Sequence, residues 1–258
     1  MNYEKKVLLC PDSQEGIFTS VYEGWSWAVK GIDVAILIKE PENLELFCSY
    51  INISPDLEKA QKVAGTIRKR LGWYVYETLC YVAASGYEEK GTIILQVLVQ
   101  ALGKGGCGRQ IMDKLTDPYV NLALKLRTRV WHELHRYYGF VRFSQRGSVL
   151  FGKITPENDL LSLLAPHFAD RYPRENWILY DENRKKALLH PMGGPCTIRT
   201  GLKLQKTDIE KLDVMEEYED LWRVFCKSIS IRERENLHLQ QQWLPLKFRS
   251  NMPEFDKK

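Results

Sequence analysis

Residues 160–173, LLSLLAPHFADRYP, place a histidine, an aspartate and an arginine at the end of an apolar helix pattern. Spacings of three and four residues bring Asp170 and Arg171 next to His167 on the last helical turn. An aspartate that orients an imidazole lets it act as a general acid or base, and an arginine can bind a phosphate oxygen. A helix C-terminus has the same residue types, because its dipole favours cations and Pro173 would end the helix. The sequence leaves both interpretations open.

A further carboxylate, Glu157, precedes this helix in the segment TPEND. It could join His167 and Asp170 in acid–base chemistry. The alternative is a capping box in which Thr155 or Asp159 caps the helix N-terminus. We therefore name four candidate catalytic residues: His167, Asp170, Arg171 and Glu157.

Cations gather in residues 121–155, which hold seven Lys or Arg and one acid, whereas the whole chain has a net charge of +4. At 100° per residue, four of the basic side chains share one helix face, and two more follow on a predicted hairpin. Such a surface suits phosphate contacts, although a solvated helix face has the same pattern. The candidate nucleic-acid-binding residues of this segment are Lys125, Arg129, His132, Arg136, Arg142 and Arg146.

The C-terminal segment RERENLHLQQQW is rich in amides and guanidinium groups. These groups offer paired donors and acceptors that can contact base edges, and they equally coat surface helices. We add Arg234, Asn236 and Gln240 to the candidate nucleic-acid-binding residues. Tyr137, Tyr138, Phe140 and Phe143 could stack on bases, or they could pack in the core.

The segment HELH, residues 132–135, differs from the zinc motif H-E-x-x-H. Zinc ligands on one helix face need i, i+4 spacing, whereas His132 and His135 are three residues apart and have no evident third ligand. The six cysteines include no C-x-x-C pair, which argues against a zinc ribbon or an iron–sulfur cluster. We predict no metal site, no cofactor and reduced thiols.

A helix with a core side and a basic side is expected over residues 117–139. Asp117 is the cap candidate, Pro118 the first helical residue and Gly139 the stop. Two hairpins follow, in residues 140–154 with a turn near Gly147, and in residues 176–190 with a turn at 181–183. The candidate catalytic helix lies between them.

These patterns predict an α+β fold, mostly helical, with a small antiparallel sheet made of two hairpins that flank a helix. Residues 1–115 are expected to form a strand pair plus a helical layer, and residues 116–258 a second α+β region. We expect the two regions to pack as one compact unit. Residues 191–208 are expected to form a loop, and the chain from Val214 onward to be helical.

Four segments resemble a bacterial family of proteins assigned to DNA metabolism or repair: HELHRYYGFVRF, KITPENDLLSLLAPHFADRYP, WILYDENRKKALL and YEDLWRVFCKSISIRERENLHLQQQWLP. The resemblance is strong over residues 117–245 and loose before them. Members are usually encoded beside a radical-SAM protein, and in some the same domain is fused to a uracil-DNA-glycosylase-like domain. At His132 the family more often has arginine. The family pattern falls here on Glu133, His135, Arg136, Arg142, Pro156, Glu157, His167, Asp170, Arg171, Trp177, Asp181, Arg184, Arg234, Asn236 and Gln240.

The resemblance implies a role in DNA metabolism, and the sequence supports three hypotheses. The first is an accessory of a radical-SAM partner that binds nucleic acid through the basic face. The chain has no cluster-binding C-x-x-x-C-x-x-C run, so we expect it to have no radical-SAM activity of its own. The second is a DNA-processing enzyme, a hydrolase or a base-excision activity, that uses His167 and Asp170. The third is a module in which the basic face docks an acidic protein. Whether the protein is an enzyme stays open.

The bulk properties fit these hypotheses. The chain has 258 residues, of which 44% are hydrophobic and 27% charged, so it can bury a sizeable core. The charged start lacks the apolar region of a signal peptide, and no later run approaches the roughly 20 apolar residues of a membrane helix. We expect a cytoplasmic protein with no membrane partner.

Overall fold

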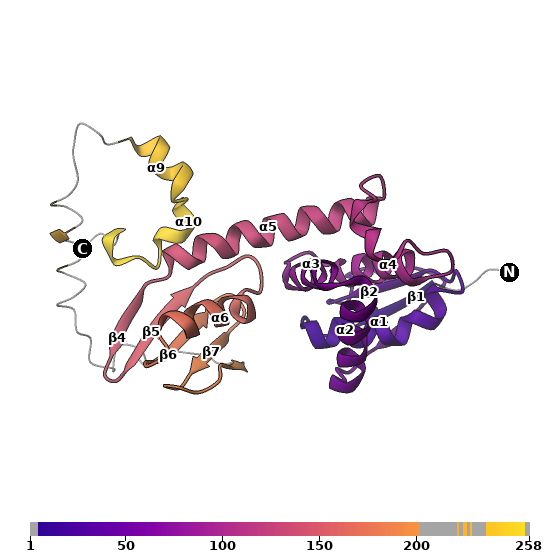
Figure 1. Ribbon diagram of the computed structural model, residues 1–258, viewed down its shortest axis with the longest axis horizontal. Coiled ribbons are helices and arrows are strands. Elements are labelled where there is room, and N and C mark those ends of the chain that lie inside the picture. The colour runs from indigo at the N-terminus through magenta and orange to yellow at the C-terminus, as the bar shows by residue number, and fades with distance from the viewer. Residues whose placement is uncertain (1–4, 202–220, 222–223, 226–227, 229–235, 256–258) are drawn as a thin grey trace. The chain divides into compact units, whose positions relative to one another are not determined.

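The computed structural model of the chain describes residues 5–201, 221, 224–225, 228 and 236–255 (Figure 1). The chain divides into two compact units, residues 1–132 and 133–258, and each is described by itself. The division predicted between residues 115 and 116, and the packing of the two regions as one unit, stay predictions.

The first unit contains a three-stranded parallel sheet with the order β2-β1-β3. Its strands are β1 (Lys5–Leu9), β2 (Val34–Leu37) and β3 (Cys48–Asn52). The central strand buries the consecutive residues Val7 and Leu8, as a parallel strand covered on both faces does. The sequence predicted a strand pair in this region, and the structure adds a third strand.

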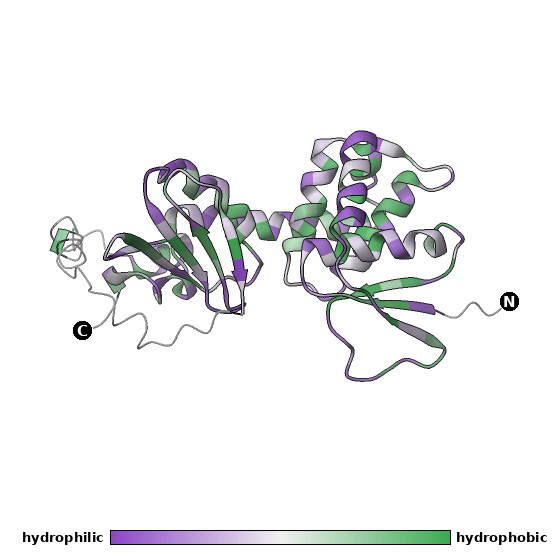
Figure 2. Ribbon diagram, turned by 90° about the horizontal axis from the view of Figure 1, so that it is seen from below, coloured by the Kyte–Doolittle hydropathy of each residue, from purple (hydrophilic) through white to green (hydrophobic). Residues whose placement is uncertain are grey.

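Five helical segments precede α5 in the first unit: α1 (Gln14–Ala28), α2 (Leu57–Leu71), α3 (Trp73–Ala84), α4 (Lys90–Leu102) and the 3-10 helix η1 (Gly108–Asp113). Side chains cap the first two, since Ser13 accepts from the Gly16 amide and Asp56 accepts from the Lys59 amide. Hydrophobic residues run along the strands, and hydrophilic residues lie on parts of the helices (Figure 2).

Helix α4 covers the outer edge of β2. The Thr92 hydroxyl accepts from the Ile36 amide at 2.8 Å and donates to the Ile36 carbonyl at 3.2 Å. This pairing satisfies backbone groups that an edge strand would otherwise expose. The helix approaches closely because Gly91, which has no side chain, faces Ile36.

The second unit contains a five-stranded sheet with the order β4-β5-β6-β7-β8. The strands are β4 (Phe143–Arg146), β5 (Val149–Ile154), β6 (Asn176–Asp181), β7 (Lys186–His190) and β8 (Thr197–Thr200). Helix α6 (Leu161–Arg171) connects β5 to β6. The two expected hairpins, β4–β5 and β6–β7, are confirmed.

The predicted small antiparallel sheet is wrong, although the α+β class is confirmed. Because α6 carries the chain back across the sheet, β6 pairs with β5 in parallel and the sheet is mixed. The short strand β8 is a fifth strand, exposed at the edge of the sheet, in a segment that was expected to be a loop. The sheet of the first unit is wholly parallel.

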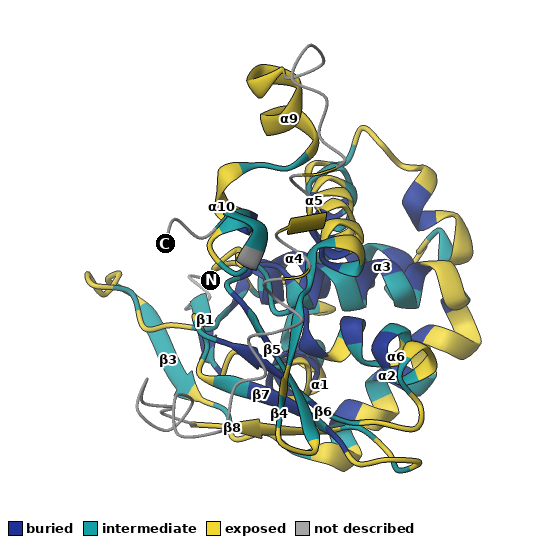
Figure 3. Cartoon of the chain, turned by 90° about the vertical axis from the view of Figure 1, so that its left-hand side faces the viewer, coloured by how far each residue is buried: buried dark blue, intermediate teal, exposed yellow. Residues whose placement is uncertain are grey.

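Helix α5 (Pro118–Phe140) contributes residues 118–132 to the first unit and residues 133–140 to the second. The described C-terminal helices are α9 (Leu237–Trp243), α10 (Leu246–Arg249) and the 3-10 helix η3 (Pro253–Phe255). Phe248 of α10 is buried against Tyr137 and Phe140, whereas α9 is exposed along its length (Figure 3). The rest of the segment expected to be helical from Val214 lies largely outside the described residues.

None of the helices in the described part of the chain combines the length and the apolar character that a membrane crossing requires. The five described cysteines are free thiols. Cys226 lies outside the described residues.

Two glycine-to-alanine substitutions test the packing of α4 on β2. A Cβ on Gly91 would overlap Ile36 Cγ2 and lie 2.8 Å from Ile36 Cβ, so Gly91→Ala should destabilise the first unit by about 1–3 kcal/mol. Gly65 lies in the middle of α2, where an added Cβ would have no atom within 4 Å, so Gly65→Ala should stabilise by up to about 1 kcal/mol. Urea denaturation followed by circular dichroism measures both; equal effects would contradict the close approach.

Candidate functional site

The cationic face of α5 is built on a well-defined helix. Asp117 caps it by accepting from the Tyr119 and Val120 amides at 2.9 and 3.0 Å, and Pro118 is the first helical residue, as predicted. The predicted apolar side of the helix is confirmed, because five of its six residues are buried and Tyr119 is partly buried. These residues are Tyr119, Ala123, Leu126, Val130, Leu134 and Tyr137.

Lys125, Arg129 and His132, all in the first unit, have exposed side chains on α5. Within the described part of the chain, these three side chains form no hydrogen bond or ion pair; His132 lies edge-on to Trp131 at 5.1 Å between ring centroids. Arg136, in the second unit, is also exposed, and its guanidinium lies 5.9 Å from the centre of the Phe248 ring. These cations are available to an anionic ligand.

Other cations of the segment are engaged inside the protein. Arg127 lies 3.4 Å from the Glu77 carboxylate and 5.2 Å from the centre of the Tyr74 ring. Arg142 donates from Nε and Nη2 to Glu254 Oε1 at 3.2 and 2.9 Å, and from Nη1 to the Gly139 carbonyl. Arg142 therefore anchors the end of the described chain to the end of α5 and is not an open phosphate ligand.

Arg146 ends β4 and is half-buried. Its Nε and Nη1 atoms are shielded from solvent and have no hydrogen-bond partner among the described residues. Of the three C-terminal candidates, Asn236 caps α9 by accepting from the Leu239 amide at 3.0 Å, and Gln240 is exposed on that helix. Arg234 lies outside the described residues.

The four aromatic residues weighed for base stacking all make contacts within the second unit. Tyr137 and Phe140 pack on Phe248, and Tyr138 stacks on His167. Phe143 of β4 packs edge-on against Phe168 of α6 and Trp177 of β6, with ring centroids 5.3 and 6.1 Å away. Tyr138 therefore contacts α6 from α5, and Phe143 contacts it from β4.

His167 lies on the last turns of α6, half-buried against Tyr138 at 4.2 Å between ring centroids. Its Nε2 atom is shielded from solvent and has no described hydrogen-bond partner. Burial and the charge of Arg171 lower the pKa of His167, although Asp170 acts in the opposite direction. The imidazole is therefore neutral near pH 7.

The neighbours of His167 do not form an acid–base pair with it. Asp170 is exposed and makes no hydrogen bond or ion pair with any described residue. Arg171 is exposed, with its guanidinium 5.6 Å from the centre of the Tyr172 ring. The three residues thus end α6 just before Pro173, as the helix-end interpretation expects.

His167 and the cationic face of α5 lie on different sides of that helix within the second unit. Tyr138, which contacts His167, follows Arg136 by two residues, or about 200° around the helix axis. Glu157 precedes α6, and His167 lies six residues, or about 9 Å along the helix, beyond its first residue Leu161. The structure therefore does not bring Arg136 and His167 onto one face of α5.

A polar network that the sequence did not single out holds the loop between β5 and α6. Glu133 of α5 is buried, with an exposed fraction of 5%, and its carboxylate accepts from the Glu157 and Asn158 amides at 2.9 and 3.1 Å. It also accepts from Asn158 Nδ2 at 2.6 Å. The Glu157 carboxylate itself is exposed and accepts from Lys247 Nζ at 2.7 Å.

Arg184 holds the other side of this loop. Its Nη1 and Nη2 atoms donate to the Pro156 and Glu157 carbonyls at 3.0 and 2.5 Å. The fully buried Asp181 accepts from the Arg184 amide at 3.1 Å, and burial raises the pKa of this carboxyl. No capping box forms, because the N-cap of α6 is Leu160 and Asp159 pairs with Lys186.

The loop lies at the carboxyl ends of the parallel strands β5 and β6, where Ile154 pairs with Asp181. Ligands of α/β sheets commonly bind at such ends. Here the buried carboxylates are occupied by N–H groups of the protein, so the network positions the loop. The sequence feature that could have predicted this network is an acidic residue, Glu133, that lies among the regularly spaced apolar residues of α5. Among the described residues, no three His, Cys, Asp or Glu side chains are grouped to hold a metal ion.

The fold and the exposed cations define an α+β protein of two units, each with its own sheet, in which α5 carries exposed basic side chains. Residues 88–254 match the family model DUF4130, a domain of unknown function. The match covers more than half of the chain, and the chain belongs to this family. A comparison with curated proteins gives no match.

Substituting Glu133 tests the loop network. Glu133→Gln replaces one acceptor oxygen with an N–H donor that faces amide donors, and we expect a loss of about 2–3 kcal/mol in the free energy of unfolding. The control, Glu157→Gln, changes a side chain that is 73% exposed and should cost less than about 0.5 kcal/mol. Denaturant titration distinguishes the two, and equal losses would contradict the network.

The lowered pKa of His167 predicts a pH-dependent stability. The unfolded chain binds a proton at this residue at higher pH than the folded chain does, so stability falls as the pH drops below about 6.5. His167→Phe keeps a ring against Tyr138 and should lose less stability than the parent between about pH 7.5 and 5.5. Urea midpoints at both pH values measure the difference. An identical pH dependence would rule out a lowered pKa.

Proposed function

We propose that the protein binds DNA through the cationic face of α5 and acts as an accessory in DNA repair or modification. The observation that carries this proposal is a pair of exposed cations of the first unit, Lys125 and Arg129, that have no ion-pair partner among the described residues; the exposed His132 lies beside them, and Arg136 of the second unit is a further candidate contact. Their three- and four-residue spacing keeps them on one side of the helix. Each phosphate contact would release a counterion and gain free energy at low salt.

The proposed partner is a radical-SAM protein that performs the chemistry. The resemblance of residues 117–245 to proteins assigned to DNA metabolism and encoded beside such a protein supports this choice. Arg146, Arg234, Asn236 and Gln240 remain candidate contacts, whereas the pairing of Arg142 with Glu254 makes it a positioning residue.

The alternative of a stand-alone enzyme would require Asp170 to orient His167. In the described structure no hydrogen bond joins them, and His167 Nε2 faces away from solvent. This geometry favours the binding role over the catalytic one. The third hypothesis, in which an acidic protein docks on the same cationic face, is tested by the same binding experiment.

Charge removal on α5 tests the proposal. Lys125→Gln combined with Arg129→Gln should weaken DNA binding at low salt by about tenfold or more and reduce the slope of log affinity against log salt by about two. Lys153→Gln is the control, because that lysine belongs to the same basic segment but pairs with Glu182 at 3.2 Å. Fluorescence anisotropy with labelled duplex and single-stranded DNA measures both.

Two results would contradict the proposal. The parent protein could fail to bind any DNA at low salt, or the control could lose as much affinity as the double variant. Binding of an acidic protein in place of DNA, abolished by the same double variant, would assign the cationic face to the protein-docking alternative.

A further inference from the structure

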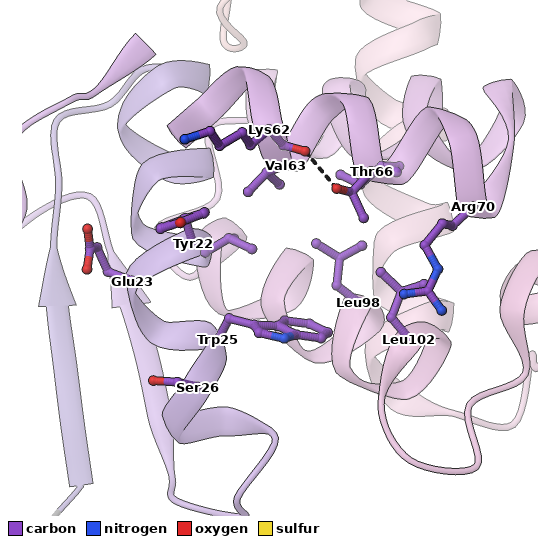
Figure 4. Close-up of a pocket in the computed structure, with 12 residues that line it drawn as sticks. Tyr22, Glu23, Trp25, Ser26, Lys62, Val63, Thr66, Arg70, Leu98 and Leu102 are labelled. Carbon is purple, nitrogen blue, oxygen red and sulfur yellow. Dashed lines mark hydrogen bonds between the residues drawn. The ribbon is translucent and has the colours of Figure 1, made fainter. Parts of the chain in front are cut away.

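The first unit contains a pocket of about 520 Å³ between α1, α2 and α4 (Figure 4). Pockets of roughly 300–1,000 Å³ with apolar walls and a few polar groups are typical of small-molecule sites. The pocket lies wholly in the first unit and includes no residue of the cationic face of α5.

The walls of the pocket are mainly apolar. The Trp25 indole extends from α1 across the pocket, and Leu98 and Leu102 of α4 lie beside it (Figure 4). Val63 of α2 lines the opposite side. Trp25 is only partly buried, so a face of its ring system is accessible to a flat hydrophobic group.

The charges around the pocket are positive and uncompensated. Lys62 and Arg70 of α2 line it, are exposed, and make no side-chain hydrogen bond or ion pair within the described residues. The acid that lines it, Glu23, is already paired with Lys59 at 2.7 Å. Eight residues separate the two cations, or about 12 Å along the helix. An anionic ligand would therefore find unpaired cations at the rim.

The sequence of α2 explains this arrangement. Positions 62, 66 and 70 follow one helix face at spacings of four residues, so Lys62, Thr66 and Arg70 point to the same side. The Thr66 hydroxyl donates to the Lys62 carbonyl at 2.8 Å and keeps its short side chain close to the helix. Figure 4 shows the Arg70 side chain extending from α2 toward Leu102.

We propose that this pocket binds an organic anion with a flat aromatic body, the chemistry of a nucleoside monophosphate. The aromatic ring stacks on Trp25 between the two α4 leucines, and the phosphate binds the Arg70 guanidinium, whose planar fork matches two phosphate oxygens. Lys62 adds a second positive charge at the rim. The site is separate from the proposed DNA-binding face, and its ligand is either a free nucleotide or the phosphorylated end of a strand.

Calorimetric titration of the full chain tests the ligand class. Deoxyadenosine monophosphate should bind, whereas deoxyadenosine and inorganic phosphate, which each lack one half of the ligand, should bind at least about tenfold more weakly. Arg70→Gln should weaken monophosphate binding by about tenfold or more. The matched control is Lys69→Gln, which removes the same charge from the next residue of α2 but does not line the pocket.

A second pair of measurements locates the ligand and its source. Trp25→Leu keeps an apolar wall but removes the stacking surface, and it should also weaken binding by about tenfold. If the natural ligand is the phosphorylated end of a strand, a short single strand with a 5′-phosphate displaces the monophosphate. If the natural ligand is a free nucleotide, the strand does not displace it. The variant with Lys125→Gln and Arg129→Gln should bind the monophosphate as the parent does.

The proposal is overturned if the monophosphate does not bind at about 1 mM, or if Arg70→Gln and Lys69→Gln weaken binding equally. An acidic helical peptide that binds in a Trp25-dependent way, with no monophosphate binding, would also overturn it. If the parent protein binds the monophosphate but no DNA, the proposed function is rejected and the proposal for this pocket is supported.

Discussion

The arrangement of the second unit depends on the hydrogen bonds that the buried carboxylate of Glu133 accepts. A carboxylate removed from water is costly unless donors surround it, and here three N–H groups of Glu157 and Asn158 do so. They fix the loop that leaves β5 and starts α6, and Arg184 fixes the same loop from the other side. Once this loop is fixed, α6 can return the chain to pair β6 with β5 in parallel.

The same network gives several residues of the resemblance pattern a structural role. Asp181 and Arg184 lie at the carboxyl ends of the parallel strands, a common place for ligands, but their polar atoms bond the protein itself. His167 likewise makes an aromatic contact with Tyr138 in place of a hydrogen bond with Asp170. A match of residue types to a family pattern can therefore reflect the architecture that the family shares.

Cations divide into two groups once their partners are known. Arg127 and Arg142 are paired with carboxylates from other segments and contribute to packing. Lys125 and Arg129 on α5, like Lys62 and Arg70 on α2, are exposed and unpaired within the described chain. Net charge alone does not separate these groups. The unpaired cations carry the two binding proposals, one for an extended polyanion and one for a small anion beside an aromatic ring.

The sequence by itself determined the features that depend on neighbouring residues. The cap and start of α5 at Asp117 and Pro118, its buried and cationic sides, and the hairpin turn at Gly147 follow from local hydrogen bonding and from the 3.6- and two-residue periods. The tertiary structure decided the rest. The parallel pairing of β5 with β6, the contact of Tyr138 with His167 and the pairing of Arg142 with Glu254, 112 residues away, join segments that are separated along the chain. No local period encodes such contacts, since they arise only when buried faces pack together and each buried charge must find a partner.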